Sequence, residues 1–179
     1  MFTCSDTIRI GSLIVWGRSG ALAWVLTRLI HLFDPDQWIR KNYKTWRRWW
    51  HTSQIVDWSE QDGWILDEAV GTGDRRIPLK DLKGPYIVIN WLPDNITAEE
   101  CQNFINEYSG FKYDKWAYLW VALNRLSRNF FPRIADNRHM CWERTADFCM
   151  FMGHPICHVN EMAYMPLMIE RYAKRCGHD

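Results

Sequence analysis

The chain has 179 residues, with 22 lysine and arginine residues against 21 aspartate and glutamate residues, a formal net charge of +1. This length suits a single domain over residues 1–179, which buries about 70% of its unfolded surface and folds without a disulfide or a metal. Hydrophobic residues make up 47% and charged residues 24% of the chain, which excludes wholesale disorder. The near-zero net charge gives no global reason to expect nucleic-acid binding.

The six cysteines do not form the dense framework of a small disulfide-rich protein, so we expect reduced thiols. The N-terminus lacks a signal-peptide pattern, and together these features predict a cytoplasmic protein. The apolar stretch 12–33 contains Arg18 and Arg28, and charges are costly inside a bilayer. We therefore expect no transmembrane segment and interpret 10–16 as a strand and 21–33 as a helix.

Apolar runs bounded by turn residues predict further extended segments. Residues 54–58 and 64–70 flank a Gln-Asp-Gly turn and are expected to form a hairpin. Residues 76–79 form a short extended piece after a second turn. Residues 86–91 are interpreted as a central strand, because a β-branched run lies between two prolines.

Helices are expected mainly in the second half of the chain. Thr97 and Glu100 are spaced as a capping box, which predicts a helix that ends at Gly110. Strands first and helices last indicate an α+β fold, in which a small antiparallel sheet packs with helices. Further helices are predicted at residues 114–128, 141–152 and 166–175.

Cys141 is the cysteine whose surroundings best suit a nucleophile. It is expected to open a helix, where unpaired N–H groups and the helix dipole favour a thiolate, and Arg138 and His139 precede it. From context alone, the commoner role of such a cysteine is that of a buried small hydrophobic residue. The other five lie on apolar helix faces, in a loop or near the chain ends: Cys4, Cys101, Cys149, Cys157 and Cys176.

A nucleophilic cysteine needs a base, and the base needs a third group that orients it. His51 stands just before the predicted strand 54–58, where a rigid backbone can hold an imidazole. Asp67 and Glu68 lie on the neighbouring strand, whose paired Cβ atoms are about 5 Å away. Alternation puts the two acids on opposite faces, so one of them is the expected partner of His51. Taken singly, His51 is more often a packing or surface histidine, and each acid a solvated strand residue.

Several short motifs follow one another along the chain in an order typical of one protein group. They are Ile8-Arg9-Ile10-Gly11-Ser12-Leu13-Ile14-Val15, His51 before Ile55-Val56, Leu66-Asp67-Glu68-Ala69, Arg76-Ile77-Pro78-Leu79, Tyr86–Trp91, Gly110-Phe111-Lys112-Tyr113-Asp114 and Cys141-Trp142-Glu143-Arg144. Each motif is weak alone, and their order carries a resemblance over roughly residues 8–155. Through these motifs the sequence resembles the circularly permuted papain-like group of the NlpC/P60 superfamily, which contains YiiX/YaeF-like and lecithin:retinol acyltransferase-like proteins.

The resemblance implies a permuted papain-like fold and a hydrolase of the cysteine peptidase or amidase type, or an acyltransferase, that cleaves an amide or ester bond. Cys141 would attack the carbonyl, His51 would take its proton, and Glu68 would orient His51, with Asp67 as the alternative. A backbone N–H at the start of the Cys141 helix would donate to the oxyanion. A cell-wall peptide is the leading substrate class by resemblance, and no cofactor is implied.

Three departures from the group leave a second interpretation open. Ser12 stands where the group has aspartate, and Trp142 replaces a small residue, which indicates a changed pocket. Three residues also separate His51 from the apolar strand. If Ser53-Gln54 is aligned with the group's Ser-His, Gln54 takes the base position and the chain is a catalytically silent binding protein of the same fold. We favour His51, because imidazole is the usual proton acceptor.

Two patterns suggest other kinds of site. The stretch 38–51 interleaves basic and aromatic residues, as in surfaces that bind nucleic acids, sugars or membranes, although a packed amphipathic helix is the favoured interpretation. Potential zinc ligands have a spacing that matches no familiar finger, so we expect no metal: Cys149, His154, Cys157 and His158, with His139 and Cys141 upstream.

The twelve tryptophans are an unusual feature of the composition. Tryptophan often lies where an apolar body meets a polar edge, as in ligand grooves. Half of them are close in sequence to the proposed site and are expected to wall a groove for a bulky or apolar acyl group: Trp46, Trp49, Trp50, Trp58, Trp64 and Trp142.

Overall fold

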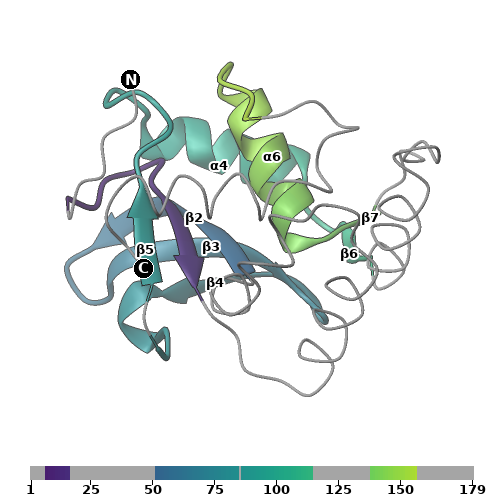
Figure 1. Cartoon of the computed structure of the whole chain (residues 1–179), viewed down its shortest axis with the longest axis horizontal. Coiled ribbons are helices and arrows are strands. Elements are labelled where there is room, and N and C mark those ends of the chain that lie inside the picture. The colour runs from purple at the N-terminus through teal and green to yellow at the C-terminus, as the bar shows by residue number, and fades with distance from the viewer. Residues whose placement is uncertain (1–6, 17–50, 85, 115–137, 157–179) are drawn as a thin grey trace, which may run out of the picture.

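The computed structural model describes residues 7–16, 51–84, 86–114 and 138–156 of the chain. Within them, the main unit is a five-stranded antiparallel sheet with the strand order β4-β3-β2-β1-β5 (Figure 1). Its strands are β1 (Leu13–Trp16), β2 (His51–Ser59), β3 (Gly63–Val70), β4 (Gly73–Pro78) and β5 (Tyr86–Ile89).

The predicted hairpin is confirmed, because β2 and β3 pair antiparallel around the expected turn. β2 begins at His51, earlier than the predicted start at residue 54. Thr52, Ser53 and Gln54 are buried and pair with β1, because their polar groups find hydrogen-bond partners inside the protein. The expectation that His51 stands before the strand is therefore wrong, since it is the first residue of β2.

β5 lies at the edge of the described sheet and not at its centre, so the prediction for 86–91 is wrong in this respect. The strand ends at Ile89 and pairs with β1 on one side. Its burial alternates, with Ile87 and Ile89 in the core and Tyr86 exposed. A β-branched run reports packing on the two faces of a strand and not its neighbours within the sheet, which is why the run was a poor guide to position.

β1 is also shorter than the predicted strand 10–16. Ile10 and Gly11 form a turn, and Gly11 has a φ of 84°. A positive φ suits glycine, because a Cβ at this position meets Ile96 at 3.3 Å. The turn delivers Ser12 to the start of β1, where the Ser12 hydroxyl accepts from Arg9 N at 3.0 Å and donates to Asn90 Oδ1 at 2.6 Å. In this chain Ser12 therefore fixes the turn.

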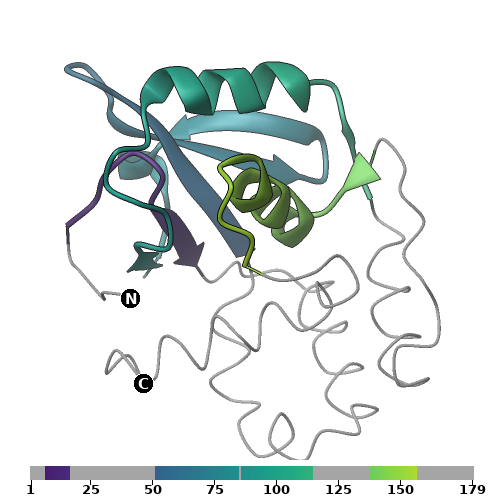
Figure 2. The ribbon, with the colours of Figure 1, turned by 90° about the horizontal axis from the view of Figure 1, so that it is seen from above.

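Two helices of the described residues pack on the same face of the sheet, α4 (Ala98–Glu107) and α6 (Cys141–Phe151) (Figure 2). The predicted capping box of α4 is confirmed: Glu100 N donates to Thr97 Oγ1 at 3.2 Å, and Thr97 N donates to Glu100 Oε2 at 2.8 Å. α6 begins at Cys141 as predicted and is followed by Gly153 in a left-handed turn. The helices predicted at 21–33, 114–128 and 166–175 lie outside the described residues.

Short elements complete the described part of the chain. A 3-10 turn, η1 (Leu79–Asp81), follows β4, and two short strands, β6 (Lys112–Tyr113) and β7 (Arg138–His139), pair in parallel just before α6. β7 thus leads directly into the helix that Cys141 opens. The antiparallel sheet and its helices establish an α+β class.

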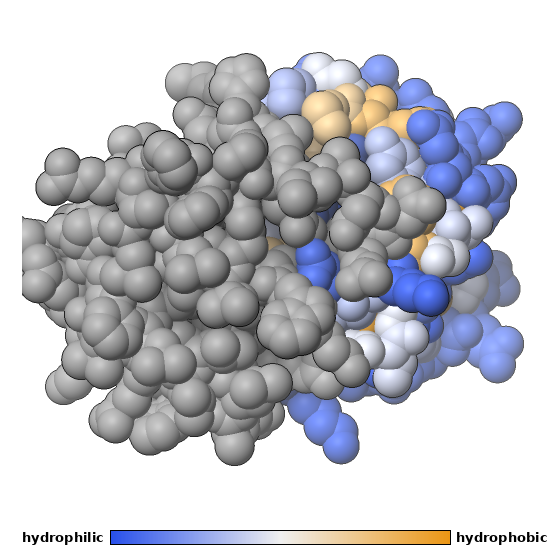
Figure 3. Space-filling view, turned by 90° about the vertical axis from the view of Figure 1, so that its right-hand side faces the viewer, coloured by the Kyte–Doolittle hydropathy of each residue, from blue (hydrophilic) through white to orange (hydrophobic). Residues whose placement is uncertain are grey.

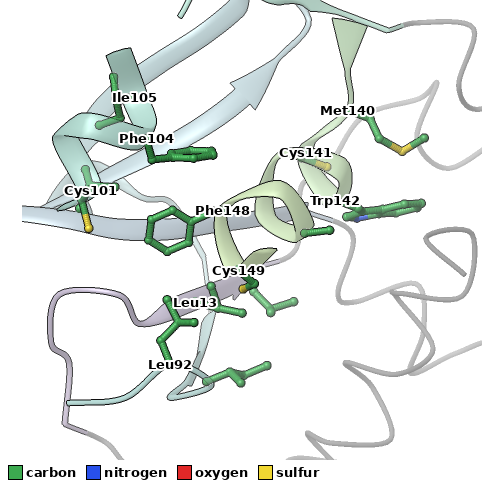
Figure 4. Packing of buried hydrophobic residues seen from close by; sticks show 14 of the residues in the cluster. Leu13, Leu92, Cys101, Phe104, Ile105, Met140, Cys141, Trp142, Phe148 and Cys149 are labelled. Carbon is green, nitrogen blue, oxygen red and sulfur yellow. The ribbon is translucent and has the colours of Figure 1, made fainter. Parts of the chain in front are cut away.

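The core lies between the sheet and the two helices (Figure 4). Phe104 of α4 and Phe148 of α6 meet edge to face with ring centroids 5.1 Å apart, and both are fully buried. A second, smaller cluster covers the opposite face of the sheet and contains Ile14, Trp16, Ile55, Leu66 and Leu79.

The described surface that is visible in Figure 3 is mainly hydrophilic, with small apolar areas. No helix among the described residues is long and apolar enough to cross a membrane. The large apolar side chains exposed within the described part are Trp58, Tyr86, Met150 and Phe151.

The capping box of α4 gives a first prediction. Thr97→Ala removes the hydroxyl that caps the helix and is expected to lower the free energy of unfolding by about 1 kcal/mol. Urea denaturation measures this as a lower midpoint with an unchanged slope. Thr72→Ala, which changes an exposed threonine in the turn between β3 and β4, is the control and should stay within about 0.5 kcal/mol. Equal midpoints for Thr97→Ala and the wild type would contradict the assignment.

Candidate functional site

The start of α6 lies beside the start of β2. The Thr52 hydroxyl donates to the carbonyl oxygen of Cys141 at 3.1 Å, and the Thr145 hydroxyl lies 3.0 Å from the same oxygen. At the helix N-terminus, Met140 N donates to Glu143 Oε2 at 2.9 Å. These bonds fix the first turn of α6, which places the Cys141 thiol at the end of β2 where His51 lies.

His51 is buried, with 3% of its side chain exposed, and two groups hold its ring. Its edge meets Trp16 with ring centroids 4.9 Å apart at an interplanar angle of 65°. Nε2 lies 2.7 Å from Glu68 Oε2, an ion-pair distance, although the angle at Nε2 is not that of a well-aligned hydrogen bond. The Cys141 thiol is also within hydrogen-bonding reach of the ring. The structure therefore brings Cys141, His51 and Glu68 together.

Glu68 is fully buried and meets a cation through each of its oxygens. On β4, Arg75 stands directly opposite Glu68 in the strand register, and its Nε donates to Oε1 at 2.7 Å. On β2, His51 contacts Oε2, and the Ser53 hydroxyl donates weakly to the same oxygen at 3.4 Å. Trp16 Nε1 in turn donates to Ser53 Oγ at 3.1 Å. Neighbours on β2 and β4 therefore hold the carboxylate in place, and Trp16 of β1 holds Ser53.

These contacts control the protonation of the site. Burial lowers the pKa of His51, because it disfavours the charged ring, but the charge and hydrogen bond of Cys141, followed by those of Glu68, outweigh burial and raise the pKa to about 9. Burial raises the pKa of Glu68, whereas the hydrogen bonds and charges of His51 and Arg75 outweigh it and lower that pKa. At neutral pH the histidine is therefore an imidazolium and Glu68 a carboxylate.

Asp67, the alternative third residue, faces the other side of β3. Arg144 of α6 contacts both of its oxygens, with Nε 2.7 Å from Oδ2 and a second nitrogen 3.1 Å from Oδ1. Gln54, the alternative base, donates to Asp67 Oδ2 at 2.6 Å and accepts from Thr145 at 3.2 Å. Asp67 and Gln54 thus belong to a buried network that joins α6 to the sheet, and Glu68 is the acid that meets His51.

Three residues of the site were not predicted from the sequence: Trp16, Ser53 and Arg75. Trp16 reaches His51 through the pairing of β1 with β2, and no local pattern reveals that register. Ser53 lies two residues from His51 on the same face of β2 and meets Glu68 of β3 across the hairpin. Arg75 had a readable signal, since a two-residue turn between β3 and β4 places Val70 opposite Gly73 and hence Glu68 opposite Arg75.

The predicted cluster of tryptophans is wrong for the two on the hairpin. Trp58 and Trp64 stand opposite each other near the turn, and seven residues at about 3.3 Å each place Trp58 about 23 Å along the strand from His51. Trp142 is buried in the core beside Cys141. Trp46, Trp49 and Trp50 lie outside the described residues, as does nearly all of the basic and aromatic stretch 38–51.

The other described cysteines belong to the core. Cys101 and Cys149 are fully buried, and both are free thiols, as is Cys141. Burial above all raises the pKa of Cys101 to about 12, which keeps it a protonated thiol. The described residues contain no group of three or more histidine, cysteine or acidic side chains arranged to hold a metal. Cys157 and His158 of the proposed zinc pattern, with Cys4 and Cys176, lie outside them.

No family model matches this chain, and no curated protein matches it in sequence. The side chains of the site are therefore the guide to its chemistry. A buried imidazole between a cysteine sulfur and a carboxylate is an arrangement suited to proton transfer and to nucleophilic attack by sulfur.

The contact between His51 and Glu68 makes a prediction about protonation. The ring of His51 should titrate near pH 9 when followed by NMR, and Glu68→Gln should lower that pKa, because it removes a negative charge 2.7 Å from Nε2. Asp57→Asn removes an exposed carboxylate from the same strand and is the control, with no change expected. A pKa of His51 that is equal in the wild type and in Glu68→Gln would contradict the assignment.

The network on the other face makes a prediction about stability. Arg144 is 1% exposed and neutralises Asp67 and Asp74. Arg144→Met leaves two carboxylates without this partner and should cost about 3–5 kcal/mol in the free energy of unfolding, measured by urea denaturation. Arg76→Met, at an exposed position of β4, should cost less than about 0.5 kcal/mol. Similar losses in the two variants would rule out a special role for the buried network.

Proposed function

We propose that the chain is a cysteine hydrolase or acyltransferase of the permuted papain-like kind, acting on an amide or ester bond. The observation that carries the proposal is one buried imidazole that contacts a helix-opening cysteine and a fully buried carboxylate. The order of the motifs, which resembles the NlpC/P60 superfamily, supports the same function.

The first half of the reaction uses Cys141 and His51. The sulfur, after giving its proton to His51, attacks the carbonyl carbon, so that a C–S bond forms and the carbonyl π electrons move to oxygen. When the oxygen electrons return, the bond to the leaving nitrogen or oxygen breaks, and His51 gives its proton to that atom. The products are the free amine or alcohol and a thioester on Cys141.

The second half releases the acyl group. Water, or an acceptor alcohol or amine, attacks the thioester carbon while His51 accepts its proton. The C–S bond breaks, and the sulfur leaves as a thiolate beside the imidazolium. The difference between hydrolase and acyltransferase is therefore the acceptor that enters the site, and both activities use the same side chains.

Position on the helix supplies a donor for the oxyanion. Cys141 is the first residue of α6, and the first N–H groups of a helix have no partner within the helix. Met140 N donates to Glu143, and the backbone N–H of Cys141, the next along the chain, would donate to the attacked carbonyl. This N–H and the dipole of α6 would stabilise the negative oxygen. A cell-wall peptide remains the leading substrate class, by resemblance.

The catalytically silent alternative required Gln54 at the position of the base. The hydrogen bonds of Gln54 to Asp67 and Thr145 direct it into the network beneath α6. The imidazole of His51 lies within hydrogen-bonding reach of Cys141 and can accept its proton. These contacts support the enzyme over the silent binding protein.

Thiol alkylation tests the proposed function. At pH 6, iodoacetamide should label Cys141 at least ten times faster than Cys101 or Cys149, since about one in 300 ordinary thiols is ionised at that pH. All three residues are at most 2% exposed, so static exposure does not favour any one of them. His51→Ala should slow the labelling of Cys141 and leave the other two unchanged, measured by peptide mass spectrometry.

Asp57→Asn, remote from the thiol on β2 and exposed, is the control for nonspecific effects and should label like the wild type. Equal rates at the three cysteines, with no response to His51→Ala, would overturn the proposal.

A further inference from the structure

We propose that Arg75 is a positioning residue of the site, whose charge keeps Glu68 ionised against His51 and so holds the imidazolium in place beside Cys141. The proposal rests on the proposed function and adds a fourth member to its site. Arg75 acts through Glu68 and does not touch the reacting atoms.

The geometry places Arg75 where no other described cation can replace it. Its Nε lies 2.7 Å and a terminal nitrogen 2.6 Å from Glu68 Oε1, so the guanidinium binds one carboxylate oxygen through two nitrogens. The register of β3 and β4 fixes this approach, because the two residues stand directly opposite each other. The oxygen that Arg75 leaves open, Oε2, is the one that faces His51.

Burial is the reason that Glu68 needs this cation. The carboxylate is fully buried, and a buried charge without a partner is costly, so it takes up a proton instead. A protonated Glu68 no longer attracts the imidazolium. Arg75 stabilises the carboxylate from the side away from the thiol, while 45% of its own side chain remains in solvent and keeps its hydration.

The groups around Glu68 form a row, which we call the charge row: the Cys141 sulfur, His51, Glu68 and Arg75. From β2, His51 and the neutral Ser53 face Glu68; from β4, Arg75 faces it. From α6, Cys141 acts on Glu68 through His51.

A second group of charges lies on the other side of β3. Asp67, which is buried, and Asp74, which is partly buried, each pair with Arg144 beneath α6. The charge row therefore has Arg75 as its terminal cation within the described part of the chain.

Removing that cation shifts the whole row in one direction. Without a positive charge at position 75, adding a proton becomes easier, whether it goes to Glu68 or to the Cys141 sulfur. The pH at which Cys141 loses half of its reactivity on the acid side should therefore rise. An opposite charge in direct contact shifts a pKa by about 1–3 units. Because Arg75 is half exposed, solvent weakens this effect, and we expect the acid midpoint to rise by about one pH unit in Arg75→Gln.

The experiment measures the rate of Cys141 alkylation by iodoacetamide from pH 3 to pH 9 in the full-length chain. Arg75→Gln should raise the acid midpoint by about one pH unit. Arg75→Lys, which keeps the charge, should have a midpoint close to that of the wild type. Arg76→Gln is the matched control, because Arg76 is the next residue on β4 and donates to Gln102 of α4. Its profile should superimpose on that of the wild type. Thermal unfolding of each variant shows that the profiles come from folded protein.

The possible outcomes separate the two proposals. If the wild-type midpoint lies near 8.5, as for an ordinary thiol, the proposed function fails. If the wild type reacts at low pH but Arg75→Gln has the same midpoint, the function stands and the role of Arg75 is wrong. If Arg75→Gln does not fold, Arg75→Met, which keeps the aliphatic stem and removes the charge, takes its place: an upward shift relative to Arg76→Gln supports the role, and identical profiles overturn it.

Discussion

The buried contact between His51 and Glu68 is the constraint on which the candidate site depends. A carboxylate with no exposed surface stays charged only when cations meet it, and the sheet supplies them from strands on both sides. His51 on β2 meets one oxygen of Glu68, and Arg75 on β4 meets the other. The register in which β2, β3 and β4 pair therefore sets the geometry of the site. Because the imidazole is held by Trp16 and Glu68, it does not need substrate to take up its orientation.

Two neighbouring acids, Asp67 and Glu68, point to opposite faces of β3 and have different roles. Glu68 faces the imidazole, whereas Asp67 binds Arg144 and attaches α6 to the sheet. The helix that this second network holds is the one that Cys141 opens. A change at Asp67 therefore acts on the chemistry through the placement of the helix, while a change at Glu68 acts on it through the proton. The two effects can be separated by experiment, because a change at Asp67 alters the free energy of unfolding and a change at Glu68 alters the pKa of His51.

The features that could be predicted from the sequence depend on residues close together along the chain. The capping box at Thr97, the helix that starts at Cys141 and the hairpin of β2 and β3 depend on residues a few positions apart, and the structure has all three. The alternation rule also separated Asp67 from Glu68, although it left open which one meets His51. The early start of β2 was missed because its first residues are polar, and polar residues enter a strand interior only when partners from distant segments satisfy them.

The same distinction explains why the tryptophans misled. Nearness in sequence placed Trp58 and Trp64 at the site, but a strand carries its residues away at about 3.3 Å each, so a hairpin separates its turn from its open end. Among the described residues, Trp16 meets the ring of His51, and it comes from β1 through pairing across the sheet. Its indole also donates to Ser53, which donates to Glu68. An aromatic side chain so placed does more than fill space, because it excludes water from the ion pair and holds a hydroxyl toward the same carboxylate. Trp16 therefore both packs against the imidazole and, through Ser53, helps to hold the Glu68 carboxylate. A substitution at Trp16 that preserves its volume but removes the indole N–H would still change the protonation of His51.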